Sequence, residues 1–87
     1  MAAYRVELLP AAVRDLESLV APLRERIAAR IDALAAAPRP HGAEKLSGHD
    51  KRWRIRVGDY RVIYEVHDQR VLVLVVHRRE VYKSMIY

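Results

Sequence analysis

The residues of this chain best suited to chemistry are arginines that recur at every second position. Arg52, Arg54 and Arg56 alternate with apolar residues ahead of a Gly58-Asp59 pair, and Arg61 follows that pair. In an extended strand this spacing places the arginines on one side and the apolar residues on the other. A guanidinium is a planar fork that stays charged at any working pH and matches phosphate oxygens. The spacing therefore predicts a β-hairpin with a phosphate-binding face.

Other familiar catalytic arrangements are missing from the sequence. It contains no cysteine, no phosphate loop and no glycine-rich dinucleotide fingerprint, and its histidines lack metal-ligand spacing. Fixed positive charges with histidine and tyrosine suit phosphodiester cleavage without a metal or other cofactor, because arginines can offset the negative charge of the transition state. In RNA the 2′-OH can be the nucleophile, so the protein has to orient it and manage protons. The candidate residues are Lys45, Lys51, Arg52, Arg54, Arg56, Arg61, His77, Arg78, Arg79 and Tyr82.

The arginine row also has a plainer explanation, because a half-buried strand must turn something polar outward. That explanation predicts that each arginine is tied to its own local acid, whereas the phosphate-binding hypothesis predicts a shared pocket. Trp53, Tyr60 and Tyr64 fall on the apolar side and are expected in the core rather than in a base-stacking platform. Tyr82 lies just past a dibasic pair and does not fit the apolar repeat of a neighbouring strand or helix. It is therefore a functional candidate.

The hairpin is expected to belong to a single small α+β domain spanning residues 1–87. Residues 4–8 alternate as a strand, and Pro10 and Pro22 open two amphipathic helices joined by a short turn. A short extended piece is expected at Lys45-Leu46, and the β-branched run at 70–77 predicts a central strand under the helices. The predicted order is an N-terminal strand, a helical hairpin and a three-stranded antiparallel meander (β-α-α-β-β-β), with an open, basic sheet face. The segment after it is a helical turn or a loop.

The overall charge points to an anionic partner. The formal net charge is +5 on 87 residues, which suggests nucleic acid or an acidic protein, although such a charge can also serve solubility alone. No apolar run approaches the roughly 18 residues of a membrane span, and the N-terminus lacks a signal-peptide pattern. The sequence thus predicts a soluble cytoplasmic protein with no membrane partner.

Three segments together resemble the RelE/ParE superfamily, the toxin halves of bacterial type II toxin–antitoxin systems. They are Glu44-Lys45-Leu46, the hairpin at 53–64 with its Gly-Asp-Tyr-Arg turn, and the ending at 77–82, His-Arg-Arg-Glu-Val-Tyr. The resemblance covers essentially the whole chain and implies a RelE-like toxin. Such a toxin is an endoribonuclease that cuts mRNA in the ribosomal A site, inhibits translation, and leaves a 2′,3′-cyclic phosphate and a 5′-OH.

The resemblance also implies roles for individual residues. Arg54 and Arg56 would hold and activate the RNA, and Arg61 would stabilise the phosphate. Either Arg78 or Arg79 would lie near the leaving oxygen. The role implied for Tyr82 is to stack on or orient the nucleotide. Among the remaining candidates, Lys45, Lys51, Arg52 and His77 are expected to contact RNA.

The chain departs from the family pattern at two strand positions, where arginines replace lysines. An arginine is a poor base because its pKa exceeds roughly 12. We therefore expect His77 or Tyr82 to assist proton transfer, unless the reaction depends on electrostatics alone.

The resemblance implies a cognate antitoxin whose acidic C-terminal segment folds over the basic face. A ParE-like toxin that inhibits DNA gyrase and cuts no RNA is the main alternative. A catalytically inactive module that binds RNA or the antitoxin is a further one.

Overall fold

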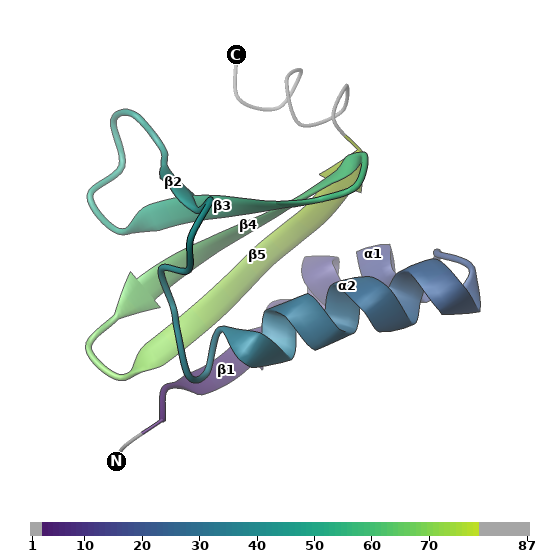
Figure 1. Cartoon of the computed structure of the whole chain (residues 1–87), viewed down its shortest axis with the longest axis horizontal. Coiled ribbons are helices and arrows are strands. Elements are labelled where there is room, and N and C mark those ends of the chain that lie inside the picture. The colour runs from purple at the N-terminus through teal and green to yellow at the C-terminus, as the bar shows by residue number, and fades with distance from the viewer. Residues whose placement is uncertain (1–2, 79–87) are drawn as a thin grey trace.

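The computed structural model describes residues 3–78, and Figure 1 shows two helices lying along one face of a twisted sheet. Within these residues the five strands follow the order β1-β5-β4-β3-β2. β1 pairs parallel with β5, and the other neighbours pair antiparallel. The elements are β1 (Arg5–Leu8), α1 (Pro10–Glu17), α2 (Ala21–Ala33), β2 (Glu44–Lys45), β3 (Arg52–Val57), β4 (Tyr60–His67) and β5 (Arg70–Arg78).

This architecture confirms the predicted α+β class, the helical hairpin and the meander β3–β4–β5. Two features add to the prediction. The N-terminal strand joins β5 in parallel, so the helical hairpin carries the chain from one edge of the sheet to the other. The short extended piece expected at Lys45-Leu46 is instead β2 at Glu44–Lys45, paired with β3.

Both helices begin with a proline in the first turn rather than with a side-chain cap. Leu9 and Val20 occupy the N-cap positions in extended conformation, and neither helix start has a side-chain cap hydrogen bond. A proline there removes an N–H that has no intrahelical partner anyway. No helix within residues 3–78 is long and apolar enough to cross a membrane.

The main core lies between the helices and the sheet face that they cover. Tyr64 is its largest fully buried side chain, and Trp53 and Tyr60 pack against it partly buried. The prediction that these three aromatic residues lie on the apolar side of the hairpin is therefore confirmed. The buried core residues are Ala12, Leu16, Ile27, Ile31, Leu34, Ile55, Val57, Val62, Tyr64, Val66, Val71, Val73 and Val76.

The opposite face is less uniformly basic than expected. A register shift at Ile63/Tyr64 pairs Ile63 with Val75 and Tyr64 with Val73, which leaves Leu74 without a cross-strand partner on β4. Leu74 and Val75 pack against Ile63 and Leu46 in a second, smaller apolar cluster. The face opposite the helices therefore carries a small apolar cluster beside its arginines, in which Leu46 and Ile63 are buried.

Candidate functional site

The β3–β4 turn sets which side chains of the hairpin share a face. Gly58 has a φ of +60°, and no residue other than glycine has a positive φ within residues 3–78. A two-residue turn with glycine first at positive φ matches the type II′ hairpin, whose twist suits antiparallel strands. The resulting register places Arg56 opposite Arg61, and Arg61 opposite His77 on β5.

These three residues form a row across β3, β4 and β5, which we call the cationic row: Arg56, Arg61 and His77. Arg61 is only 4% exposed, and its Nη1 donates to the Tyr60 carbonyl oxygen at 3.3 Å. Arg56 is exposed. The Nε2 atom of His77 lies 3.9 Å from Oδ2 of Asp15 on α1. The row thus places two guanidinium side chains and one imidazole side chain at paired positions on three adjacent strands.

Glu44 joins this site from β2. Its carboxylate accepts hydrogen bonds from Nε of Arg54, at 2.8 Å, and from Nη2 of the same guanidinium. The hydrogen bond from Arg54 holds the pKa of Glu44 below its usual range, and the charges of Arg56 and Arg61 act in the same direction. Glu44 is therefore an ionised acceptor beside the cationic row at neutral pH.

Arg52 lies further along the same face and belongs to a different group. Its Nη2 and Nε donate to Oε2 of Glu65, at 2.7 and 3.2 Å, and His67 Nε2 lies 3.0 Å from Oε1 of Glu65. The hydrogen bond from Arg52 lowers the pKa of Glu65. For Arg52 the plainer explanation holds, since this arginine is tied to a local acid.

Arg54 is likewise tied to a local acid, Glu44, but it also shares a cleft with Arg56. A cleft of about 430 Å³ opens at the edge of β3, beyond the short β2. Arg54 and Arg56 both line it. The complete lining is Arg30, His41, Gly42, Ala43, Glu44, Arg54, Ile55 and Arg56.

Several candidates from the sequence lie away from this cluster. Lys45 is registered with Trp53, on the side of the sheet that faces the helices, and not on the open face. Arg78 is registered with Tyr60, and its Nε donates to the Tyr60 hydroxyl at 3.3 Å, so it too departs from the face of Arg61. Lys51 is exposed in the turn before β3.

Two further candidates, Arg79 and Tyr82, lie outside the described residues. Within residues 3–78, no three His, Cys, Asp or Glu side chains gather as they would around a metal ion.

Sequence reasoning did not assign roles to Glu44 and Arg30. Glu44 stands in the motif at 44–46, but its place beside Arg54 depends on the β2–β3 register. Arg30 belongs to the polar side of α2, and only the tertiary fold brings it to the edge of β3. The sequence signal that could have found Glu44 is the expected extended piece at Lys45-Leu46. Pairing this piece with β3 would have brought Glu44 next to the arginines.

Residues 6–82 match the family model described as the ParE toxin of the type II toxin–antitoxin system parDE. None of the curated proteins matches the chain. Among solved structures, a chain of the archaeal RelE–RelB complex from Pyrococcus horikoshii is 33% identical, with 88% of this chain and 96% of that chain covered and a TM-score of 0.79.

Two more distant structures show the same fold. The isolated RelE toxin of E. coli is 26% identical, with 97% of this chain and 96% of that chain covered and a TM-score of 0.75. A chain of the chromosomal ParDE system from P. aeruginosa is 14% identical, with 87% of this chain and 96% of that chain covered and a TM-score of 0.69.

Proposed function

We propose that this chain, which belongs to the ParE toxin family of type II toxin–antitoxin systems and so to the RelE/ParE superfamily, acts as a RelE-like endoribonuclease on mRNA at the ribosome. The observation that carries the proposal is the cationic row, with Glu44 beside it. A buried guanidinium next to an exposed one suits a phosphate that gains charge during reaction. The 33% identical chain from an archaeal RelE–RelB complex supports the RelE-like assignment.

In the proposed reaction the RNA supplies its own nucleophile. The 2′-oxygen attacks the adjacent phosphorus, so that the O2′–P bond forms and the P–O5′ bond breaks. Arg56 and Arg61 bind the phosphate and stabilise its added negative charge. The 2′-OH proton passes to the ionised carboxylate of Glu44, and protonated His77 gives a proton to O5′. Of the two arginines that the resemblance offers for the leaving oxygen, the proposal takes Arg79, because Arg78 departs from the face of Arg61. The role that the resemblance assigns to Tyr82 belongs to this proposal as well.

A cognate antitoxin is part of the proposal. Two solved relatives are complexes of RelE with RelB, and an exposed nuclease face needs to be restrained. An acidic partner segment would match the open face, where Arg56 is exposed.

Gyrase inhibition is the competing function, because the matching family model is that of ParE toxins. A gyrase inhibitor has no chemical need for a carboxylate and a histidine grouped around arginines. Single substitutions in the cationic row therefore distinguish the two functions.

The decisive experiment compares Arg61→Lys with the parent. Lysine keeps the charge but loses the bidentate fork, so we expect cleavage of a translated mRNA to fall roughly 10²-fold. Arg5→Gln is the matched control, because Arg5 is exposed on β1, away from the site, and it should cleave like the parent. Gyrase-dependent DNA breakage by the parent, without mRNA cleavage, would refute the proposal.

A further inference from the structure

The cleft at the edge of β3 has more positive charge than the proposed cleavage uses. Three arginines are among its lining residues, Arg30, Arg54 and Arg56, together with one acidic residue, Glu44. That carboxylate is already hydrogen-bonded to Arg54. Within residues 3–78, neither Arg30 nor Arg56 forms an ion pair with a carboxylate. The cleft thus retains the capacity to bind an added anion.

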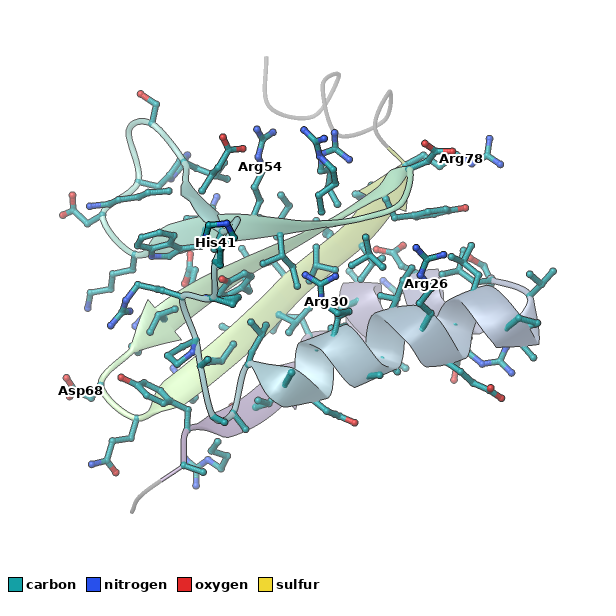
Figure 2. The ribbon with its side chains drawn as sticks, in the orientation of Figure 1. Arg26, Arg30, His41, Arg54, Asp68 and Arg78 are labelled. Atoms are coloured by element: carbon teal, nitrogen blue, oxygen red, sulfur yellow. The ribbon has the colours of Figure 1, made fainter. Side chains whose placement is uncertain are left out.

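Arg30 reaches the cleft from a different element than the other arginines. It is an exposed residue of α2, and Figure 2 shows it between the helix and the edge of the sheet. His41 comes from the loop that leads to β2 and lines the same cleft. Neither residue takes part in the cleavage chemistry proposed above. Arg56, by contrast, belongs to both the cationic row and the cleft, so the two sites are contiguous.

We infer that this cleft is a second nucleotide subsite, in which Arg30 and Arg56 bind the phosphate next to the scissile one and His41 stacks on its base. The inference rests on the proposed ribonuclease function and extends it to the length of RNA that the toxin holds. A cleft of about 430 Å³ falls in the size range of small-ligand sites and has room for one nucleotide. Guanidinium forks and an aromatic ring are the groups by which proteins hold single-stranded RNA.

A nucleotide fits the cleft better than an acidic peptide does. A carboxylate side chain would use the arginines but not the ring of His41, whereas a nucleotide engages both. A single strand that leaves Arg61 can also pass over Arg56 to Arg30 without leaving positively charged surface. The continuity of charge therefore favours RNA as the occupant.

The test measures how affinity grows with RNA length. Fluorescence anisotropy would compare a dinucleotide with a tetranucleotide, both 2′-O-methylated so that they cannot be cleaved. We expect the parent to bind the tetranucleotide about tenfold more tightly, and Arg30→Gln to lose most of that gain. Arg30→Gln should also reduce the salt dependence of tetranucleotide binding by roughly 0.7 in slope, the amount of one phosphate contact on a single strand.

Two further variants separate the contributions. His41→Ala should lose part of the length-dependent gain with little change in the salt slope, since the ring is proposed to stack on a base and not to contact a phosphate. Arg14→Gln is the matched control, because it removes the same charge from an exposed position on α1 that does not line the cleft. It should keep the parent's gain.

The outcomes distinguish this inference from the proposed function. If Arg30→Gln and the parent bind the tetranucleotide equally and both cleave mRNA, the subsite is refuted and the function stands. If Arg30→Gln weakens only the binding of an acidic peptide, the occupant is a protein segment and the inference is wrong. If the parent binds neither oligonucleotide, the subsite is refuted, and the proposed function is decided separately by the cleavage of a translated mRNA.

Discussion

Arg61 and Arg56 are neighbours in the cationic row, yet they differ sharply in exposure. Arg61 is 4% exposed, whereas Arg56 is open to solvent. Removing a guanidinium from water is costly, and an adjacent positive charge raises that cost. Such a placement does little for stability, but it presents a fixed donor set that needs no reorganisation when an anion arrives. At the residue scale, this is the physical reason why the proposed reaction has the scissile phosphate beside Arg61.

Glu65 provides a contrasting case, in which an arginine on the same face serves stability. Its carboxylate is hydrogen-bonded to Arg52, and its pKa is lowered. A carboxyl whose pKa is lower in the folded chain stabilises the fold above its unfolded pKa, and this contribution is lost as the pH falls through the folded pKa. We expect Glu65→Gln to lower the free energy of unfolding by about 1 kcal/mol at pH 7.

The same difference should shrink as the pH is lowered from 7 to about 2.5, because protonation of the folded carboxyl removes this contribution. Urea denaturation at the two pH values measures it, with Glu25→Gln on the exposed side of α2 as the control. An equal loss at both pH values would show that the carboxylate charge contributes nothing.

The sequence predicts on which face of the sheet an arginine lies wherever apolar and polar residues alternate with period two. Arg54, Arg56 and Arg61 follow from the pattern and the turn alone. Glu44 and Arg30 do not, because one depends on the pairing of a two-residue strand and the other on how α2 packs over the sheet.

At the scale of elements, alternation predicted the strands but not every register. The shift at Ile63/Tyr64 leaves Leu74 without a partner, and nothing in a run of valines and leucines marks where such a shift falls. Lys45 and Arg78 were candidates by residue type, but the registers with Trp53 and Tyr60 place them on the other face, since successive residues of a strand alternate between faces. The alternation in β3 and β4 was easier to interpret because polar residues stand between the apolar ones.

Helix α1 covers the part of the β5 edge that β1 leaves unpaired. β1 pairs with β5 only as far as Leu8 and Val73, so β5 continues beyond it. There, Val76 N–H donates to Oδ2 of Asp15 at 2.9 Å. We expect Asp15→Ala to lower the free energy of unfolding by about 1–2 kcal/mol, because it leaves a partly buried donor unsatisfied.

Asp15→Asn should cost less, since its amide oxygen can still accept that hydrogen bond. Chemical denaturation and the hydrogen exchange of the Val76 amide measure both effects. Faster exchange at Val76 in Asp15→Ala, but not in Asp15→Asn, is the expected result. Identical exchange in the two variants would mean that the edge is protected in another way.

Tyr64 links the sheet to the loop that leads to β2. Its hydroxyl donates to the Pro38 carbonyl oxygen at 2.7 Å, and burial raises its pKa from 10.0 to about 12. Because the unfolded chain ionises first, stability from neutral Tyr64 is complete below about pH 10 and is lost as the pH rises towards 12. Tyr64→Phe should therefore lose about 1 kcal/mol at pH 7, the usual value of a hydrogen bond.

The variant should also become less sensitive to alkali than the parent, since it lacks the titrating group. Denaturant titrations between pH 8 and about pH 11 would show converging stabilities. Tyr4→Phe, at a half-buried position on another segment, serves as the control. A parent and a Tyr64→Phe variant with parallel pH profiles would refute this account.

At the scale of the whole molecule, the fold separates two tasks. The helices cover one face of the sheet (Figure 1) and pack against it to form the main core, whereas the cationic row lies on the other face. The fold class was predictable because the helical and strand periods are strong and the turns are marked by glycine and proline. The parallel β1–β5 pairing was not, because it joins residues more than 60 positions apart and leaves no local signal.

The concentration of positive charge on the folded chain leads to a prediction about stability. The folded state brings Arg54, Arg56 and Arg61 together, whereas the unfolded chain disperses them, so a polyvalent phosphate should bind the folded state preferentially. Inorganic tripolyphosphate at ten times its dissociation constant would add about 1.4 kcal/mol. For a domain of this size, that corresponds to an increase in melting temperature of roughly 6–11 °C.

Thermal unfolding followed by circular dichroism tests this, with sodium chloride at equal ionic strength as the control for screening. Arg56→Gln should reduce the tripolyphosphate effect, because it removes a guanidinium that belongs to both the cationic row and the cleft. Arg14→Gln removes an equal charge elsewhere and should preserve the effect. If both variants respond alike, the stabilisation reflects net charge, and the arrangement of arginines on the open face has no part in it.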